Sequence, residues 1–198
     1  MRIGVLALQG AVAEHMRMLE KAGAEAVAVK RTEQLDRIDG IIIPGGESTT
    51  IGKLMNTYGF VDPLRSFSAQ GKPIFGTCAG LILIAKTIEG GTPEAHLALM
   101  DMKVARNAFG RQRESFEADL DVKGVGGQVR AVFIRAPIIL ETGPQVEVLS
   151  EYGGRIVAAR QQHLLATSFH PELTEDHRLH AYFLDMVKQS RSASASVD

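Results

Sequence analysis

The stretch Pro73–Lys86, PIFGTCAGLILIAK, decides the fold of this chain. Residues 73–77 form a short apolar run typical of a buried strand, and residues 79–86 favour a helix directly behind it. Cys78 stands at the junction, between glycines at positions 76 and 80. A strand that passes at once into a helix is the repeating unit of an α/β sheet, so this stretch predicts that architecture.

The residues before this stretch repeat the same unit. An apolar run without alternation predicts a strand buried on both faces, as in a parallel sheet. In chain order we predict a strand over Ile3–Leu8, a helix over Ala11–Ala22, strands over Glu25–Lys30 and Ile38–Pro44, and a helix over Ser48–Asn56 with Ser48 or Thr49 as its cap. This alternation predicts a doubly wound, mostly parallel sheet flanked by helices.

From Leu97 onward strand-like runs dominate the sequence. They span residues 100–105, 115–122, 129–135, 146–150, 156–161 and 164–169, and a last helix is predicted over Leu179–Lys188. We interpret these runs as additional antiparallel and edge strands of the same domain, which is predicted to span residues 1–189. The tail, residues 190–198 (SRSASASVD), is small and polar and is predicted to be disordered.

The composition argues against several classes of function. A chain of 198 residues suits one large domain, and 22 basic against 23 acidic residues give no support for binding nucleic acid or an anionic membrane. The single cysteine excludes an intramolecular disulfide. The sequence has no apolar run near the ~20 residues of a membrane span, and its N-terminus lacks the layout of a signal peptide. We therefore expect a cytoplasmic protein.

Cys78 has the sequence surroundings of a nucleophile. In a strand–turn–helix of the form G-x-C-x-G, the glycines allow a tight turn that lifts the thiol out of the sheet. The start of the following helix favours thiolate over thiol, and the N–H of Ala79 is available for an oxyanion hole. A lone cysteine is more often a buried structural residue, but its position between these glycines favours catalysis.

His170 and Glu172 are the predicted partners of this thiol, in the segment FHPE that closes the last predicted strand. A thiol nucleophile needs an imidazole base, and the imidazole needs a group that fixes its tautomer. Two residues apart, both side chains face the same side of an extended backbone, a conformation that Pro171 favours for His170. The other histidines are predicted to be surface or packing residues: His15, His96, His163, His177 and His180.

Two loops are predicted to face Cys78 from the carboxyl ends of neighbouring strands, where ligands of such sheets bind. In PGGEST, residues 44–49, paired glycines let backbone N–H groups approach a ligand, which suits an oxyanion loop with Gly46 as donor. A phosphate loop is a weaker alternative because the Walker spacing is absent, and a plain turn with a helix cap is another. Gln9 and Gly10 should lie on the same rim, where a docking surface could reach them; a simple turn is the alternative.

Taken together, GTCAG, HPE and PGGES resemble the class I (triad) glutamine amidotransferases. Longer strings are more specific and resemble the glutaminase subunit of pyridoxal 5′-phosphate synthase: VLALQGAVAEH, PGGESTTIGKLM, GTCAGLILIA, ARNAFGRQRESFE, VFIRAP and SFHPELTED. The resemblance runs over about residues 1–188 and leaves out the Ser/Ala tail.

This resemblance implies a role for particular residues. Cys78, His170 and Glu172 match the catalytic triad, and the oxyanion hole is expected at Gly46 and Ala79. The positions that match glutamine-binding residues are Gly46, Glu47, Ser48, Arg106, Ile134 and Arg135. An arginine there suits the α-carboxylate of glutamine, although without the resemblance both arginines would be interpreted as solvated surface charges. The resemblance further implies a synthase subunit as partner, met by Gln9 and Gly10, and a subunit that needs no cofactor or metal of its own.

The predicted function is hydrolysis of L-glutamine to L-glutamate and ammonia, which the synthase subunit uses to make pyridoxal 5′-phosphate. Three alternatives stay open: a glutaminase of another synthase, such as the imidazole glycerol phosphate or anthranilate enzymes, a thiol hydrolase or protease, and a non-catalytic module whose Cys78 senses oxidants. We also expect low activity from the isolated chain, because a peptide flip at Gly45–Gly46 could make or break the oxyanion hole at modest cost.

Overall fold

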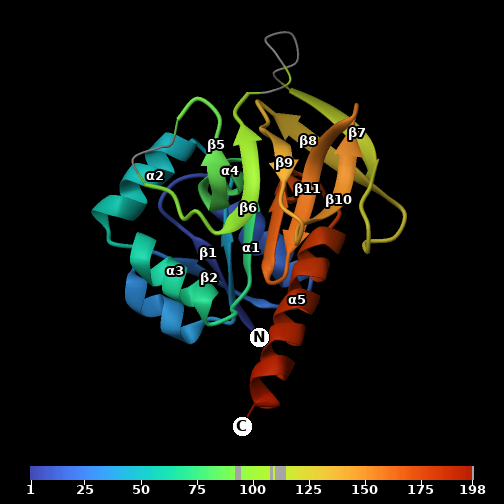
Figure 1. Cartoon of the computed structure of the whole chain (residues 1–198). Helices are drawn as coiled ribbons and strands as arrows, with labels where there is room; N and C mark the ends of the chain where they lie inside the picture. The colour runs from blue at the N-terminus through green and yellow to red at the C-terminus, as the bar shows by residue number, and fades with distance from the viewer. Residues whose placement is uncertain (92–94, 108, 110–114, 198) are drawn as a thin grey trace.

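A mostly parallel sheet forms the centre of the computed structural model, which describes residues 1–91, 95–107, 109 and 115–197 (Figure 1). Within these residues the strand order is β2-β1-β3-β4-β12-β11-β9-β6-β5, with β10 paired to β11. The parallel strands that carry the site are β1 (Arg2–Leu6), β2 (Glu25–Val29), β3 (Gly40–Ile43), β4 (Ile74–Thr77) and β12 (Leu164–Thr167). The predicted doubly wound α/β class is therefore confirmed.

The second half of the chain adds antiparallel strands to this sheet, as the sequence predicts. They are β9 (Ile138–Thr142), β10 (Glu147–Tyr152) and β11 (Arg155–Gln161), and they continue to β6 (Met100–Ala105) and β5 (Ala85–Ile88). A separate antiparallel ribbon is formed by β7 (Ser115–Asp121) and β8 (Gln128–Ile134). It packs over the sheet, because Phe133 of the ribbon and Phe169 after β12 share one buried cluster.

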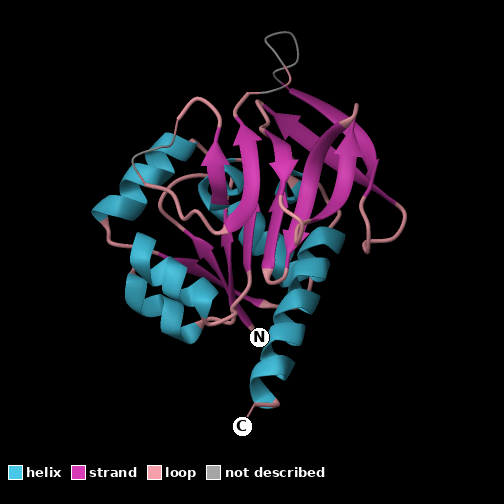
Figure 2. Cartoon of the chain, viewed as in Figure 1, coloured by secondary structure: helices cyan, strands magenta, loops and turns pink. Residues whose placement is uncertain are grey.

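Helices cover both faces of the sheet, as Figure 2 shows. On one face lie α2 (Ser48–Thr57), α3 (Val61–Ala69) and α4 (Ala79–Ile84), and on the other α1 (Val12–Lys21) and α5 (Arg178–Ala195). A 3₁₀ helix, η1 (Thr32–Arg37), precedes β3. The strand β3 shows why the sheet needs two covers: Ile41 and Ile43 pack into the first cluster and Ile42 into the second.

Several elements and one cap differ from the sequence prediction. The helix α3 has no counterpart in it; Pro63 lies in the first turn of this helix, where the missing N–H costs nothing. The short strand β9, which follows Pro137, also has no counterpart. The helix predicted over residues 79–86 ends at Ile84, because residues 85–88 form β5 and pair with β6. The cap of α2 is Glu47 rather than Ser48 or Thr49, because its carboxylate accepts from the N–H groups of Thr49 and Thr50.

The tail also differs from the prediction. Residues 190–195 continue α5 as helix, and the hydroxyl of Ser190 donates to the carbonyl of Gly71, 2.7 Å away. The segment contains no glycine or proline that would end the helix, and its alanines are strong helix formers.

Candidate active site

Cys78 lies at a strained elbow between β4 and α4. Its φ of 51° and ψ of −103° fall outside the regions that non-glycine residues usually adopt. Its N–H donates to the carbonyl of Thr167, 2.8 Å away, which ties the elbow to β12. The flanking glycines are required by close packing: a Cβ on Gly76 would lie 2.5 Å from the carbonyl oxygen of Gly80, and one on Gly80 would lie 2.0 Å from that of Ile43.

His170 and Glu172 meet across a tight turn rather than along an extended strand. The Nδ1 of His170 lies 2.6 Å from Oε1 of Glu172. The sequence predicts an extended backbone here, but Pro171–Leu173 form a 3₁₀ turn (η2), because the fixed φ of Pro171 also suits the first position of a helical turn. The N–H of His170 donates to the carbonyl of Val132, 2.8 Å away, which holds the turn against β8.

The surroundings of His170 favour its protonated form. Burial by itself lowers the pKa of this imidazole, but hydrogen bonds with Cys78 and Glu172 and the charge of Glu172 outweigh burial and raise the pKa to about 10. Glu172 is only 1% exposed, so its charge acts on the ring with little screening by water. At neutral pH His170 is therefore an imidazolium, a cation beside the sulfur of Cys78.

A pocket of about 550 Å³ opens beside Cys78. Its walls include these predicted site residues: Gln9, Gly10, Gly46, Glu47, Ser48, Cys78, Ala79, Arg106, Ile134, Arg135 and His170. Glu172 lies behind His170, away from the pocket. The residues that the sequence singles out thus come together at the carboxyl ends of the strands. Of the string ARNAFGRQRESFE, positions 108 and 110–114 lie outside the described residues.

The glycine loop is held by hydrogen bonds from the rim beside it. The carbonyl of Gly45 accepts from the N–H of Ala11 at 3.0 Å, and the N–H of Glu47 donates to Oε1 of Gln9 at 2.9 Å. Gly10, with φ of 109°, packs so closely that a Cβ there would lie 2.0 Å from the oxygen of Gly45. Because the carbonyl of Gly45 and the N–H of Gly46 belong to one trans peptide, the contact with Ala11 also fixes the direction of that N–H.

The charged residues of the pocket differ in how firmly they are held. The carboxylate of Glu47 is engaged by its own helix, and its hydrogen bond with Thr50 lowers its pKa. Arg106 and Arg135 are exposed, and within the described part of the chain no hydrogen bond or ion pair holds either guanidinium. Arg135 has φ of 42°, and the carbonyl of the preceding Ile134 lies 3.9 Å from the Sγ of Cys78.

Two of the histidines that the sequence assigns to the surface or to packing lie buried beneath His170 and Glu172 and also form polar contacts. His15 and His180 are 0% exposed, and their rings are joined by a hydrogen bond of 2.8 Å. The Nε2 of His15 also lies 3.5 Å from Oε2 of Glu172. A signal was present in the sequence: on its helix His15 falls on the apolar stripe, four residues before Leu19, where a polar side chain needs a partner.

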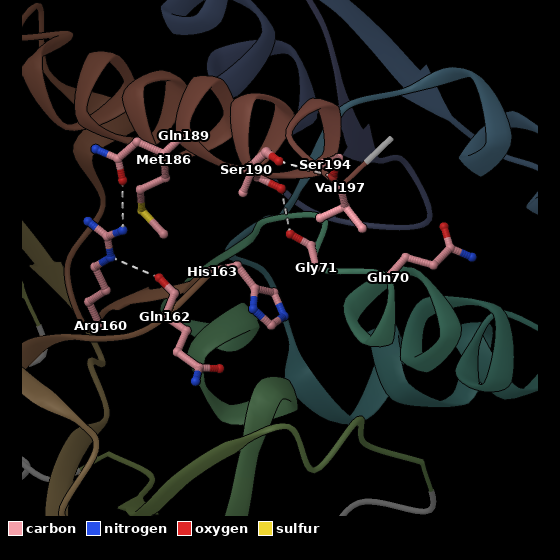
Figure 3. A pocket seen from close by; sticks show the side chains of 11 residues that line it. Gln70, Gly71, Arg160, Gln162, His163, Met186, Gln189, Ser190, Ser194 and Val197 are labelled. Carbon is pink, nitrogen blue, oxygen red and sulfur yellow. Dashed lines mark hydrogen bonds between the residues drawn. The ribbon is translucent and has the colours of Figure 1, made fainter.

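A second hollow of about 420 Å³ lies at the opposite, amino-terminal ends of β4 and β12 (Figure 3). Its Arg160 is fixed by the carbonyl of Gln162 at 2.8 Å and the amide of Gln189 at 3.2 Å. His163 reaches the hydroxyl of Ser68, 2.9 Å away. The polar side chains of this hollow are thus used in holding α5 and α3 to the sheet.

Two features are absent from the part of the chain that the structure describes. No group of three or more His, Cys, Asp or Glu side chains there is arranged to hold a metal ion. No helix among them is long and apolar enough to cross a membrane.

Comparison with known proteins gives consistent matches. The chain is 69% identical over 191 residues to a protein of Niallia circulans named pyridoxal 5′-phosphate synthase subunit PdxT, covering 96% of this chain and 100% of that one. It is 62% identical to the protein of the same name from Halalkalibacterium halodurans, covering 98% and 99%. A crystal structure titled glutamine amidotransferase superposes with a TM-score of 0.90 at 50% identity, covering 94% and 98%. The model of the SNO glutamine amidotransferase family matches residues 5–189, so the chain belongs to that family.

Proposed function

We propose that Cys78, His170 and Glu172 form the catalytic triad of a glutaminase that hydrolyses L-glutamine to L-glutamate and ammonia. The chain is the glutaminase subunit of pyridoxal 5′-phosphate synthase, as its full-length relatives are named for that complex. The observation that carries the triad assignment is the line from buried Glu172 through His170 to the strained thiol at the wall of the pocket.

In the proposed mechanism the thiolate of Cys78 attacks the side-chain amide carbon of glutamine. The imidazolium of His170 gives its proton to the nitrogen of the departing ammonia, which leaves a γ-glutamyl thioester on Cys78. The neutral imidazole then takes a proton from water, the resulting hydroxide cleaves the thioester, and glutamate leaves. Glu172 keeps the ring oriented and stabilises its charge through both steps.

The substrate is held by the pocket walls. The N–H groups of Gly46 and Ala79 are proposed as the oxyanion hole. Arg106 and Arg135 are exposed cations that suit the α-carboxylate of glutamine, whereas the carbonyl of Ile134 suits its ammonium group. Because the carboxylate of Glu47 caps α2, we assign the contribution of residues 46–48 to their backbone. We propose the cytoplasm as the location, because a thiol nucleophile suits a reducing compartment.

The synthase subunit is proposed to control this site through Gln9 and Gly10. Both lie on the pocket rim and hold the loop of Gly45 and Gly46. A partner that docks on this rim could turn the Gly45–Gly46 peptide at the expense of one hydrogen bond, that of Gly45 to Ala11. Loss of one oxyanion donor costs ~10²–10³ in kcat, so we expect activation of that order when the synthase binds.

Steady-state glutamine hydrolysis, measured with and without the synthase subunit, tests this proposal. We expect low activity alone and a rise of about 10²-fold or more in the complex. Cys78→Ala should abolish formation of pyridoxal 5′-phosphate from glutamine but leave its formation from ammonium salts intact. Full activity without the synthase would contradict only the proposed control through Gln9 and Gly10. Formation of pyridoxal 5′-phosphate from glutamine by the Cys78→Ala complex would contradict the proposed triad.

A further inference from the structure

The triad rests on a second layer of buried polar side chains. His15 of α1 and His180 of α5 are both fully buried, and Nδ1 of His15 lies 2.8 Å from Nε2 of His180. The helices that carry them are far apart in sequence, so the pair also joins the two covers of this face of the sheet. The mechanism above makes no use of either ring.

The other nitrogen of His15 faces the triad. Its Nε2 lies 3.0 Å from Oγ1 of Thr77, the residue before the nucleophile, and 3.5 Å from Oε2 of Glu172. The second oxygen of Glu172, Oε1, is taken by His170. Within the described residues Oε2 is buried and has no hydrogen-bond partner, because Nε2 of His15 lies at the outer limit of hydrogen-bonding distance. A buried carboxylate oxygen needs a donor, and the ring of His15 is the group directed at it.

The charges around the two rings decide which nitrogen carries the proton. Burial, with the charges of His180 and His170, lowers the pKa of His15 well below its usual value; burial, with His177, lowers that of His180 to about 3. Both rings are therefore neutral and have one donor and one acceptor each. The hydroxyl of Thr77 can accept from Nε2 of His15 or donate to it, but a lone pair on Nε2 would also face the carboxylate of Glu172 and repel it.

The proton of His15 therefore lies on Nε2, and its Nδ1 accepts. His180 must then donate through Nε2, which leaves its buried Nδ1 as the acceptor that ends the chain. In this arrangement His180 fixes the tautomer of His15, and His15 directs an N–H at the carboxylate. His15 thus faces Glu172 as a neutral donor and adds no positive charge that would compete with His170.

We propose that His15 is a positioning residue of the glutaminase, which holds the buried carboxylate of Glu172 toward His170 through its Nε2–H, with His180 setting its tautomer. The inference rests on the proposed triad and extends it by two residues. It predicts that a side chain at position 15 must offer a donor at the place of Nε2. The amide of glutamine can reach that place, whereas the shorter amide of asparagine stays near the place of Nδ1.

The matched pair His15→Asn and His15→Gln tests this inference in the complex with the synthase subunit. We expect His15→Asn to lower kcat on the order of 10-fold with little change in KM, and His15→Gln to recover most of the loss. The control is His163→Asn, a histidine hydrogen-bonded to Ser68 at the far end of the sheet, which should keep the wild-type kcat. Thermal unfolding of the three variants separates stability from turnover.

Nitrogen NMR of the wild-type chain gives a second readout that needs no activity. We expect Nε2–H tautomers for both His15 and His180 at pH 7. An Nδ1–H tautomer of His15 would overturn the inference, as would equal kcat values for His15→Asn and wild type. Failure of the proposed function is distinguishable, because wild type and His163→Asn would then also show no glutamine hydrolysis in the complex.

Discussion

The two ends of the parallel sheet offer hollows of similar size with different chemistry. The pocket at the carboxyl ends measures about 550 Å³ and the hollow at the amino ends about 420 Å³. Each has a histidine and at least one arginine in its wall, and each contains at least one non-glycine residue with positive φ, such as Cys78 at 51° and Gln162 at 52°. Size, residue type and backbone strain therefore do not distinguish them.

The difference lies in what surrounds each histidine. His170 is placed between a thiol and a buried carboxylate, which raise its pKa to about 10 against the effect of burial. His163 has a hydroxyl as its partner, and burial lowers its pKa. The positive φ of Gln162 belongs to the tight turn between β11 and β12, whereas that of Cys78 belongs to the elbow between β4 and α4. The chemistry that we propose is therefore placed where a buried carboxylate and an imidazole meet beside the elbow of Cys78.

Replacement of His170 or Glu172, the proposed partners of Cys78, should have the largest effect on glutamine hydrolysis. We expect His170→Asn to reduce glutamine hydrolysis about as far as loss of the nucleophile, because triad members act as a unit. Glu172→Gln should lose less, at most on the order of 10⁴-fold, because an orienting group often contributes less. His163→Asn, at the other end, should keep wild-type turnover. Wild-type rates for both triad variants in the saturated complex would require another base.

A methyl group on Gly10 should have the next largest effect. Its Cβ would meet the carbonyl oxygen of Gly45 at 2.0 Å, so Gly10→Ala must displace the oxyanion loop. We expect kcat in the complex to fall on the order of 10²-fold, the scale of one lost oxyanion donor. The control is Gly59→Ala, which has the same positive φ strain, at 71°, but open space around its Cβ. Equal kcat for the two variants would show that the loop position is unimportant.

The smallest expected effect is on the free energy of unfolding. Protonation of His170 raises this free energy, whereas protonation of His163 lowers it. Because the pKa of folded His170 is raised, its stabilisation is complete below about pH 6.5 and is lost as the pH rises toward about 10. The free energy of unfolding lost in His170→Asn should therefore shrink over that range. His163 has a lowered pKa, so its protonation destabilises the fold below about pH 6.5. The His163→Asn variant should not show this fall in the free energy of unfolding. Denaturant unfolding at several pH values measures both.

The sequence predicts the sheet and the pocket better than the layer beneath them. Glycine spacing around Cys78 and the apolar runs before it depend on local sterics, which a short window of sequence contains. The predicted contact between His170 and Glu172 is present, but the backbone between them is a 3₁₀ turn instead of an extended segment. Pro171 is compatible with both of these backbone conformations. The cap of α2 is Glu47 because the loop before it places the longer carboxylate over the helix end.

The features that the sequence does not predict involve contacts between segments that are distant along the chain. His15 and His180 are separated by 165 positions, and nothing local to either ring indicates that they share a hydrogen bond beneath Glu172. The helix of residues 190–195 also depends on a distant group, the carbonyl of Gly71, which the hydroxyl of Ser190 reaches. Such pairs become visible once the topology brings α1, α5 and β4 together.

Reaction with a glutamine-like electrophile, such as a diazo-ketone analogue, tests the central claim most directly. The complex with the synthase is incubated with the analogue, glutamine hydrolysis is followed, and the modified residue is located by peptide mass spectrometry. The account predicts stoichiometric labelling at Cys78, slowed by added glutamine, with activity lost in proportion to the label. Glutamine hydrolysis that persists after Cys78 is fully labelled would contradict it.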